Sequence, residues 1–372
     1  MPDQRAILIA AVSARALAAS ARRGGYVPLT VDFFADQDTV TVSAAQVRLG
    51  GSLAHGIDAS ELLAALETLA AAHRPLGVVC GTGFEDRADC LRRIAQRWRL
   101  FGNSGETVAR AKDPLALAEL ARDCGVPHPE ISLAPPANVS GWLRKRWGGS
   151  GGSHVRSPRN GAVAANLYFQ RRVDGIPVSA LVLADGRRAC VLGFSSQWAS
   201  SLTAQPFRYG GAVRPASLSP AVAAALAATA VRLAEAIPLV GLNSVDFLVD
   251  ERDFWFLEIN PRPGATLDIF EPPQGSLFAL HMAACEGELP RTTPMLGDAA
   301  AAATIYAEHD MLSVPHLDWP DWTADRPHAG IAVRVGEPLC TVHATATTAT
   351  EARRLVDERT AAIQAWVRLR VA

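Results

Sequence analysis

Short apolar runs alternate with helical spacings of apolar residues over the first hundred positions. Residues 7–12 form an unbroken apolar run, residues 14–23 follow with helical spacing, and Gly24 and Gly25 end that helix. The other elements expected here are strands over 27–31 and 77–80 and helices over 61–73 and 87–98. Strands that alternate with helices predict an α/β fold with a parallel sheet.

After a turn-forming cluster at residues 102–105, the pattern changes to consecutive strands. A helix over 114–124 ends at Gly125, and Ser219 with Pro220 is the expected start of a helix that continues to 236. Strands are expected over 141–146, 167–173, 178–184, 189–194, 244–249, 254–260, 302–307 and 339–344, with a last helix over 349–366. Strands in direct succession favour an antiparallel sheet.

Composition narrows the classes of partner. The chain has 372 residues, of which 49% are hydrophobic, and a formal net charge of −1, so nucleic acid is not expected as a main partner. The apolar stretch at 6–12 is too short for a membrane span or a secretion signal, so we expect a cytoplasmic protein without membrane contact. The six cysteines lack any Cys-x-x-Cys spacing, which predicts reduced thiols.

The most informative segment is the expected hairpin over 244–260. Glu258 and Asn260 are two residues apart in a strand, so their side chains share a face. Phe254 and Phe256, with Leu248 of the facing strand, are expected on the same face, which argues against a fully solvated surface hairpin, the alternative interpretation.

Asp246 joins these two side chains if it pairs with Glu258, which requires a bulge or a three-residue loop. Two carboxylates and an amide oxygen suit Mg²⁺, and Arg262 just beyond the strand suits phosphate or carboxylate. Lys145 precedes a glycine-rich run whose backbone could cover a polyphosphate. A flexible linker is the alternative interpretation of that run.

The order of these features resembles the ATP-grasp superfamily of carboxylate–amine ligases over residues 1 to about 340. The resemblance implies a pre-ATP-grasp Rossmann-like domain followed by two lobes that clasp ATP. The expected divisions are 1–105 for that domain, 106–175 for the small lobe with a glycine-rich lid, 176–297 for the large lobe with the metal site, and 298–372 for a C-terminal extension packing on the core.

The same resemblance implies ATP and Mg²⁺ as cofactors, with Mn²⁺ as a substitute, and it assigns the site residues. Lys112 and Lys145 would contact phosphates, while Arg262 and Lys145 would act on the group in transfer. The lid would be Gly148, Gly149, Ser150, Gly151 and Gly152, the adenine hinge Gln170, Arg171, Arg172 and Val173, and the metal ligands Asp246, Glu258 and Asn260. Arg171 and Pro177 stand where many relatives carry acidic residues, which leaves ribose recognition unassigned.

A narrower resemblance rests on the segments VSARA (12–16), DFFAD (32–36), GATLD (264–268) and WPDW (319–322). These are similar to ATP-grasp proteins associated with tetrahydromethanopterin and methanofuran one-carbon pathways, such as tyramine–glutamate ligases. The implied activity is amide formation through an acylphosphate, with release of ADP and phosphate.

Small-molecule carboxylate and amine substrates are the expected partners, and a homo-oligomer is left open. Ser13 and Arg15 follow the first strand, at the sheet edge where α/β proteins bind ligands, and Arg208 lies in a polar loop; all three are candidate substrate contacts. An ATP-grasp carboxylase, a small-molecule kinase and a non-catalytic ATP-binding regulator remain alternative functions.

Overall fold

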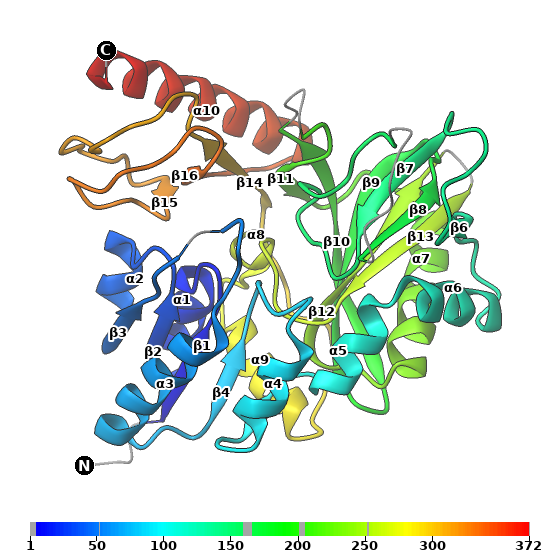
Figure 1. Cartoon of the computed structure of the whole chain (residues 1–372), viewed down its shortest axis with the longest axis horizontal. Coiled ribbons are helices and arrows are strands. Elements are labelled where there is room, and N and C mark those ends of the chain that lie inside the picture. The colour runs from blue at the N-terminus through cyan, green and yellow to red at the C-terminus, as the bar shows by residue number, and fades with distance from the viewer. Residues whose placement is uncertain (1–4, 52, 159–165, 201–204, 251–252, 372) are drawn as a thin grey trace.

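A computed structural model describes residues 5–51, 53–158, 166–200, 205–250 and 253–371, and its N-terminal part is a parallel sheet in the order β3-β2-β1-β4-β5 (Figure 1). The strands of this sheet are β1 (Ala6–Ala10), β2 (Val27–Asp32), β3 (Ala45–Arg48), β4 (Val78–Cys80) and β5 (Leu100–Phe101). The helices of this part and its exit are α1 (Arg15–Arg23), α2 (Gln37–Val42), α3 (Ala59–His73), α4 (Ala88–Ala95) and α5 (Gly105–Lys112). The predicted parallel sheet is confirmed, whereas α2, β3, β5 and α5 were not predicted.

The rest of the chain builds two antiparallel sheets. The small sheet has the order β6-β8-β7, with β6 (Ile131–Ser132), β7 (Trp142–Arg146) and β8 (Leu167–Arg171). The large sheet has the order β13-β12-β9-β10-β11-β14-β16-β15, with β9 (Ile176–Asp185), β10 (Ala189–Ala199), β11 (Tyr209–Arg214), β12 (Val240–Val249), β13 (Phe254–Asn260), β14 (Ala299–Tyr306), β15 (Thr323–Ala324) and β16 (Pro338–Ala346). The accompanying helices are α6 (Pro114–Asp123), α7 (Pro220–Ala236), α8 (Leu267–Phe270), α9 (Leu277–Cys285) and α10 (Ala349–Val371).

The C-terminal segment 298–371 continues the large sheet. β14 pairs with β11 along Ala300 to Ala303, and β16 pairs with β14, so these strands extend the same sheet. Helix α10 covers them and buries Val356 and Ile363 against the strands (Figure 1). Every helix in the described part of the chain is too short or too polar to span a membrane.

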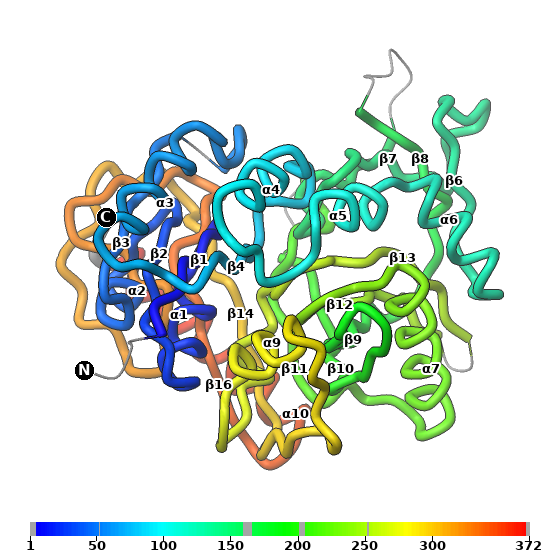
Figure 2. The backbone as a smooth tube through the Cα atoms, turned by 90° about the horizontal axis from the view of Figure 1, so that it is seen from below, coloured from blue at the N-terminus to red at the C-terminus, as the bar shows by residue number. Residues whose placement is uncertain are grey.

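The N-terminal sheet and the large sheet share one apolar core. Leu17 of α1, Phe278 of α9 and Leu183 of β9 belong to the same buried cluster. Figure 2 shows α9 between α1 and the strands of the large sheet, and α9 contacts both. Burial of this shared interface fixes the N-terminal sheet against the large sheet.

The residues predicted to start α7 and to end α6 do so in the structure. The Ser219 hydroxyl accepts a hydrogen bond from the Val222 amide at 3.3 Å, which caps α7 as predicted. Gly125 after α6 has φ +63°, a conformation that glycine adopts without strain.

Candidate functional site

A cleft of about 1700 Å³ is lined by the loops after β1 and β4, the glycine-rich segment after β7, the β12–β13 hairpin and residues of the C-terminal segment. Most of the predicted site residues line this cleft: Ser13, Arg15, Lys145, Gly148, Ser150, Gly151, Gly152, Gln170, Arg171, Arg172, Val173, Arg208, Asp246, Glu258, Asn260 and Arg262. Lys112 and Gly149 are buried beside it.

The β12–β13 hairpin adopts the register that the metal prediction required. Asp246 lies opposite Glu258, and Ser244 lies opposite Asn260. The pairing shifts by one residue after Asp246, so Leu257 is an extra, unpaired residue in β13. The predicted pairing of Asp246 with Glu258, and the bulge that it needs, are confirmed.

The bulge also corrects one prediction. Phe254 and Phe256 were expected on the face of Glu258, but Phe256 lies in the apolar core with Phe247 and Ile259, and Phe254 packs against that core. The extra residue reverses the alternation of the strand, so side chains three apart, Phe256 and Ile259, face the same way. The aromatic residues therefore anchor the hairpin from the side away from the cleft.

Hydrogen bonds hold the carboxylate of Asp246 in place. The Ser179 hydroxyl of β9 donates to Asp246 Oδ1 at 2.5 Å, and Asn260 Nδ2 donates to Asp246 Oδ2 at 2.9 Å. Because both oxygens of Asp246 are engaged, its orientation beside Glu258 is fixed. Ser179 gave no sequence signal, since its role depends on the pairing of β9 with β12.

The two carboxylates influence each other. Burial and the charge of Glu258 raise the pKa of Asp246 to about 6. Burial also favours the neutral form of Glu258, but the charges of Lys112 and Lys145 outweigh it and lower the pKa of Glu258. Paired carboxylates with an adjacent amide oxygen are a donor set that fits a hard divalent cation, which would stabilise both ionised forms.

Lys112, at the end of α5, lies directly on this donor set. Its Nζ donates to Asn260 Oδ1 at 2.8 Å and to Glu258 Oε2 at 3.3 Å, and its side chain is 5% exposed. Its charge is therefore paired with the cluster in this structure. A phosphate contact of Lys112 remains a prediction.

Lys145, on β7, has a different environment. It lines the cleft, and its ammonium has no hydrogen-bond acceptor among the residues that the structure describes. Burial lowers the pKa of Lys145, and the charge of Glu258 partly opposes that effect. Lys145 is thus a cation beside the carboxylate cluster that remains available to a ligand.

The glycine-rich segment after Lys145 packs against its neighbours. Gly148 has φ +64°, and a Cβ there would lie 2.6 Å from the Cβ of Asp86 in the loop between β4 and α4. A Cβ at Gly149 would overlap the ring of His154, and one at Gly152 would overlap the carbonyl oxygen of Phe207. These close approaches explain the glycines better than a free linker does.

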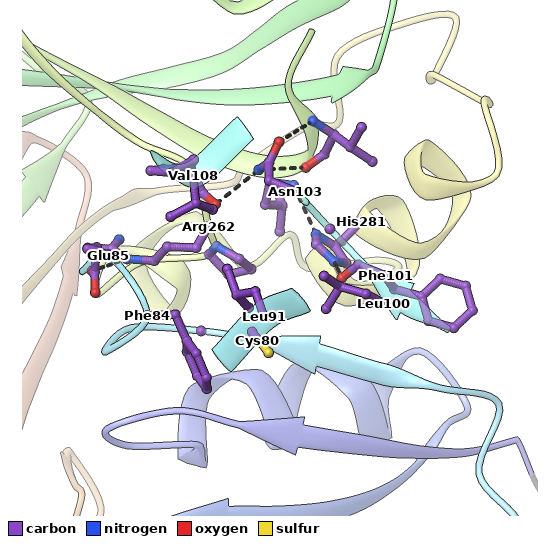
Figure 3. Close-up of a pocket in the computed structure, with 16 residues that line it drawn as sticks. Cys80, Phe84, Glu85, Leu91, Leu100, Phe101, Asn103, Val108, Arg262 and His281 are labelled. Carbon is purple, nitrogen blue, oxygen red and sulfur yellow. Dashed lines mark hydrogen bonds and ion pairs between the residues drawn. The ribbon is translucent and has the colours of Figure 1, made fainter. Parts of the chain in front are cut away.

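Arg262 joins the loop after β13 to the loop after β4. Its Nε donates to Glu85 Oε1 at 2.8 Å (Figure 3). Glu85 is buried, which alone would raise its pKa, but Arg262 and Lys112 hold that pKa below its usual value. Arg262 is therefore a paired cation that still borders the cleft.

Asn103 fixes the ends of the hairpin. Its side-chain amide donates to Asn243 Oδ1 at 2.7 Å. The same amide donates to the Pro261 carbonyl at 3.0 Å, and the side-chain oxygen accepts from the Val240 amide at 2.8 Å (Figure 3). The turn-forming cluster predicted at 102–105 thus joins the N-terminal sheet to β12 through the buried Asn103, and Ser104 caps α5.

The predicted adenine hinge lies at the end of β8. Gln170 is buried and pairs with Ile131 of β6 and Leu143 of β7. Arg171 and Arg172 are exposed at the rim, and Arg172 lies 3.5 Å from Asp174. The position at the cleft suits a hinge, and the adenine contact remains a prediction.

Arg15 is held by acidic residues that the sequence did not connect with it. Its guanidinium binds Asp268 through two nitrogens, at 2.6 and 2.5 Å, and its Nε donates to Asp325 at 3.1 Å. Ser13 also donates to Asp325, at 3.2 Å. Since carboxylates already surround Arg15, this end of the cleft does not present a free cation to a substrate anion.

Arg208, the remaining substrate candidate, forms part of the cleft wall. Its guanidinium lies 3.5 Å from the ring centroid of Tyr306 and donates to the Ser200 and Gly336 carbonyls, both at 3.2 Å. These contacts account for its burial, and a substrate contact remains a prediction.

The scarcity of lysine in the sequence is a further signal for the site. Of the 36 lysine and arginine residues, two are lysines, Lys112 and Lys145, and both lie at the carboxylate cluster. All the other residues among these 36 are arginines. Lysine offers a compact point charge that suits phosphate, so its confinement to two positions marks them out.

The residues of the candidate site from Lys112 to Arg262 fall in a segment that matches a known protein family. Residues 111–266 match the family model described as "ATP-grasp domain". This range includes both lysines, the glycine-rich segment and the carboxylate hairpin. The sequence matches no curated protein.

Solved structures share the fold of the whole chain. The biotin carboxylase domain of Hydrogenobacter thermophilus 2-oxoglutarate carboxylase, a dimer with MgADP, ADP and bicarbonate, is 14% identical, with a TM-score of 0.72 over 93% of this chain and 87% of that chain. N5-carboxyaminoimidazole ribonucleotide synthetase of Thermotoga maritima is 15% identical, with a TM-score of 0.67 over 97% and 98%. Pyruvate carboxylase of Rhizobium etli is 18% identical, with a TM-score of 0.74 over 96% of this chain but 37% of that chain.

At these identities the likeness shows the fold. The chain has a mixed α/β architecture, as the sequence predicted, and residues 111–266 match the model of an ATP-grasp domain. The match to the family model ends at residue 266, so it includes the hairpin and Arg262 but not the acidic residues Asp268 and Asp325.

Proposed function

We propose that this protein is an ATP-dependent ligase that joins a carboxylate to an amine and releases ADP and phosphate. One observation carries the proposal. Asp246, Glu258 and Asn260 converge beside an unpartnered Lys145 and a tightly packed glycine segment, within the residues that match an ATP-grasp domain.

ATP and Mg²⁺ are the proposed cofactors, with Mn²⁺ as a substitute. Asp246, Glu258 and Asn260 would hold the metal, which supplies positive charge to the phosphates. Lys145 adds a further positive charge, and the backbone of residues 148–152 covers the phosphates. The structurally similar biotin carboxylase domain of 2-oxoglutarate carboxylase is described with MgADP, which agrees with a magnesium–nucleotide ligand.

The reaction proceeds in two balanced steps. An oxygen of the substrate carboxylate attacks the γ-phosphorus, the bond to the β-phosphate oxygen breaks, and ADP leaves. The amine nitrogen then attacks the acyl carbon, the carbon–oxygen bond to phosphate breaks, and the nitrogen loses a proton. Lys145 and Arg262 act by position and charge, and the glycine segment keeps water from the acylphosphate.

The proposed substrates are small molecules. Glutamate and a tyramine-like amine, as in methanofuran-type cofactor synthesis, are our first choice because of the resemblance in four short segments. A carboxylase is the second candidate, since two of the neighbours are named carboxylases and one is described with bicarbonate. In that reaction bicarbonate would take the place of the carboxylate substrate.

The test is ADP release from ATP over a panel of carboxylates, including glutamate and bicarbonate, each with and without amines. With the correct carboxylate, hydroxylamine should trap a hydroxamate without the amine, and the full reaction should give amide, ADP and phosphate in equal amounts. Formation of AMP and pyrophosphate, or of a stable phosphorylated product without an amine requirement, would contradict the proposal.

A further inference from the structure

A second group of ionisable side chains surrounds Arg15, and three of its carboxylates, Asp36, Asp268 and Asp325, line the cleft. The carboxylates of this acidic pocket are Asp32, Asp36, Asp38, Asp268 and Asp325. Asp32 ends β2, Asp36 and Asp38 lie at the start of α2, Asp268 lies in α8, and Asp325 follows β15. Several carboxylates face one guanidinium here, so the pocket has an excess of negative charge.

Most of these carboxylates already have partners within the protein. Asp32 accepts the amides of Ala14 at 2.9 Å and Ala35 at 2.8 Å, and so holds the loops after β1 and β2 together. Asp38 accepts the amides of Asp325 at 2.8 Å and Arg326 at 3.0 Å.

Asp268 and Asp325 bind Arg15, and Asp325 also accepts from Ser13 and Thr341. These contacts account for the carboxylates as parts of the fold.

Asp36 is different. It is 4% exposed, yet no hydrogen bond to its carboxylate is present among the residues that the structure describes. It stands at the N-cap of α2 without capping that helix, and its side chain borders the cleft instead. A carboxylate that is almost fully buried and accepts no hydrogen bond from the protein is destabilising unless solvent or a ligand in the cleft supplies the donor.

We infer that Asp36 binds an ammonium group of the amine substrate. The inference rests on the proposed ligase function and adds a location for the amine. An ammonium group supplies the hydrogen-bond donors that Asp36 lacks, and the charges of Asp38 and Asp325 add attraction. Burial and the charges of Asp325, Asp32 and Asp38 raise the pKa of Asp36 to about 9, and a bound cation would favour its ionised form.

An organic cation fits this pocket better than a metal ion. Within the described residues, no three His, Cys, Asp or Glu side chains form a metal-binding group. The oxygens of Asp32, Asp38, Asp268 and Asp325 are already engaged. Phe33 and Phe34 add apolar surface to the cleft next to Asp36, which suits a hydrocarbon attached to the ammonium group.

The acidic pocket lies near the carboxylate hairpin. Tyr209 of β11 interacts electrostatically with a carboxylate of each group. Burial raises the pKa of Tyr209, and Tyr306, Asp246 of the hairpin and Asp268 of the acidic pocket raise it further. Asp36 and Glu258 border the same cleft. An amine held at Asp36 therefore enters the cavity in which we propose that the acylphosphate forms.

The experiment measures binding without turnover. Tyramine, 2-phenylethylamine and 1,4-diaminobutane are titrated calorimetrically into the full chain, each beside the alcohol that replaces its ammonium group by hydroxyl. We expect at least one amine to bind ~10-fold or more tightly than its alcohol. Asp36→Asn should remove that preference, Asp36→Glu should restore part of it, and Asp318→Asn, at an exposed position outside the cleft, should leave it unchanged.

Stability separates a binding role from a structural one. We expect Asp36→Asn to keep or raise the Tm, because it removes a carboxylate from an acidic cluster. Equal binding of amines and alcohols, no amine binding, or unchanged amine binding by Asp36→Asn would overturn the inference. Hydroxamate formation needs no amine substrate, so its absence in the wild type would instead count against the ligase function.

Discussion

Lys145 combines three properties that an ordinary surface lysine lacks. It borders the cleft, its ammonium has no hydrogen-bond acceptor among the described residues, and burial lowers its pKa. Lys112, by contrast, is already bonded to Glu258 and Asn260. The two lysines therefore differ in how readily a phosphate can reach them.

Replacement of Lys145 by methionine should lower kcat/KM for ATP by at least ~10-fold. The variant keeps the apolar stem of the side chain but loses a charge near the proposed phosphates, worth about 1.4 kcal/mol or more. Steady-state kinetics with varied ATP gives the ratio. An unchanged kcat/KM would show that Lys145 does not act on ATP.

The scarcity of lysine allows a direct test of the same site. An amine-reactive ester should modify Lys145 before Lys112, because Lys112 is 5% exposed and engaged in two hydrogen bonds. Mg–ATP should protect Lys145, and peptide mass spectrometry would measure the extent of modification. Equal modification with and without Mg–ATP would contradict phosphate binding at Lys145.

Glu258→Gln should abolish turnover while the free energy of unfolding stays near the wild-type value. The change removes a metal-type charge but keeps the shape of the side chain and an acceptor for Lys112. ADP release and urea denaturation measure the two effects. Glu288→Gln, at an exposed position, is the matched control, and full Mg–ATP turnover by Glu258→Gln would refute the metal assignment.

At the scale of the elements, two structures shape the site. The bulge in β13 directs Glu258 and Asn260 into the cleft while Phe256 and Ile259 anchor the strand in the core. The glycine segment approaches the N-terminal domain at Asp86 and the wall of the cleft at Phe207. Its packing brings the segment over the same cleft that the hairpin faces.

Gly152→Ala should lower kcat by ~10-fold or more, whereas Gly151→Ala should have a much smaller effect. Both glycines have positive φ, at +69° and +64°, so both variants bear a similar backbone strain. An alanine Cβ at 152 would overlap the Phe207 carbonyl, but none of the described atoms lies within 4 Å of a Cβ at 151. Equal kcat values for the two variants would show that the packing of the segment does not matter for turnover.

At the scale of the whole molecule, His281 of α9 joins the N-terminal sheet to the large sheet. Its Nδ1 accepts from the Leu242 amide of β12 at 2.9 Å, and its Nε2 lies 3.1 Å from the Phe101 carbonyl of β5 (Figure 3). The bond from Leu242 requires the neutral ring, because a protonated Nδ1 cannot accept, whereas Nε2–H can donate to the Phe101 carbonyl in either state. Burial lowers the pKa of His281 to about 4.

This junction predicts a loss of stability in acid. The folded state holds His281 neutral down to about pH 4, whereas the unfolded chain protonates it below about 6.5, so stability is full above 6.5 and falls between these values. For this residue the loss between pH 7.5 and pH 5 is about 2 kcal/mol.

Urea denaturation of the wild type and His281→Gln measures the contribution of this histidine. The difference in unfolding free energy between them should shrink by about 2 kcal/mol from pH 7.5 to pH 5. His128 and His154, whose pKa values burial also lowers, are present in both proteins and cancel. A difference that does not change with pH would refute the assignment.

Elements with clear local patterns were predictable, and elements defined by their surroundings were not. Helix α7 has a serine N-cap followed by proline at its first position, and the β12–β13 hairpin carries possible metal ligands on one face. Helix α9 was missed because it lies between α1 and the large sheet and is apolar on most sides, so it lacks the polar stripe that marks a surface helix. Short elements such as β15 depend on pairing with a distant strand.

The sequence by itself determined the alternation of strands and helices, the glycine segment and the residue types that suit a metal and a polyphosphate, because these are encoded in short runs of neighbours. Tertiary structure decided which charges are free. It pairs Lys112 with Glu258, Arg262 with Glu85 and Arg15 with Asp268. The partners in these pairs are between 146 and 253 positions apart in the sequence. Tertiary structure also leaves the carboxylate of Asp36 without a hydrogen-bond donor among the described residues. The packing of the sheets sets these distances, and no local pattern records them.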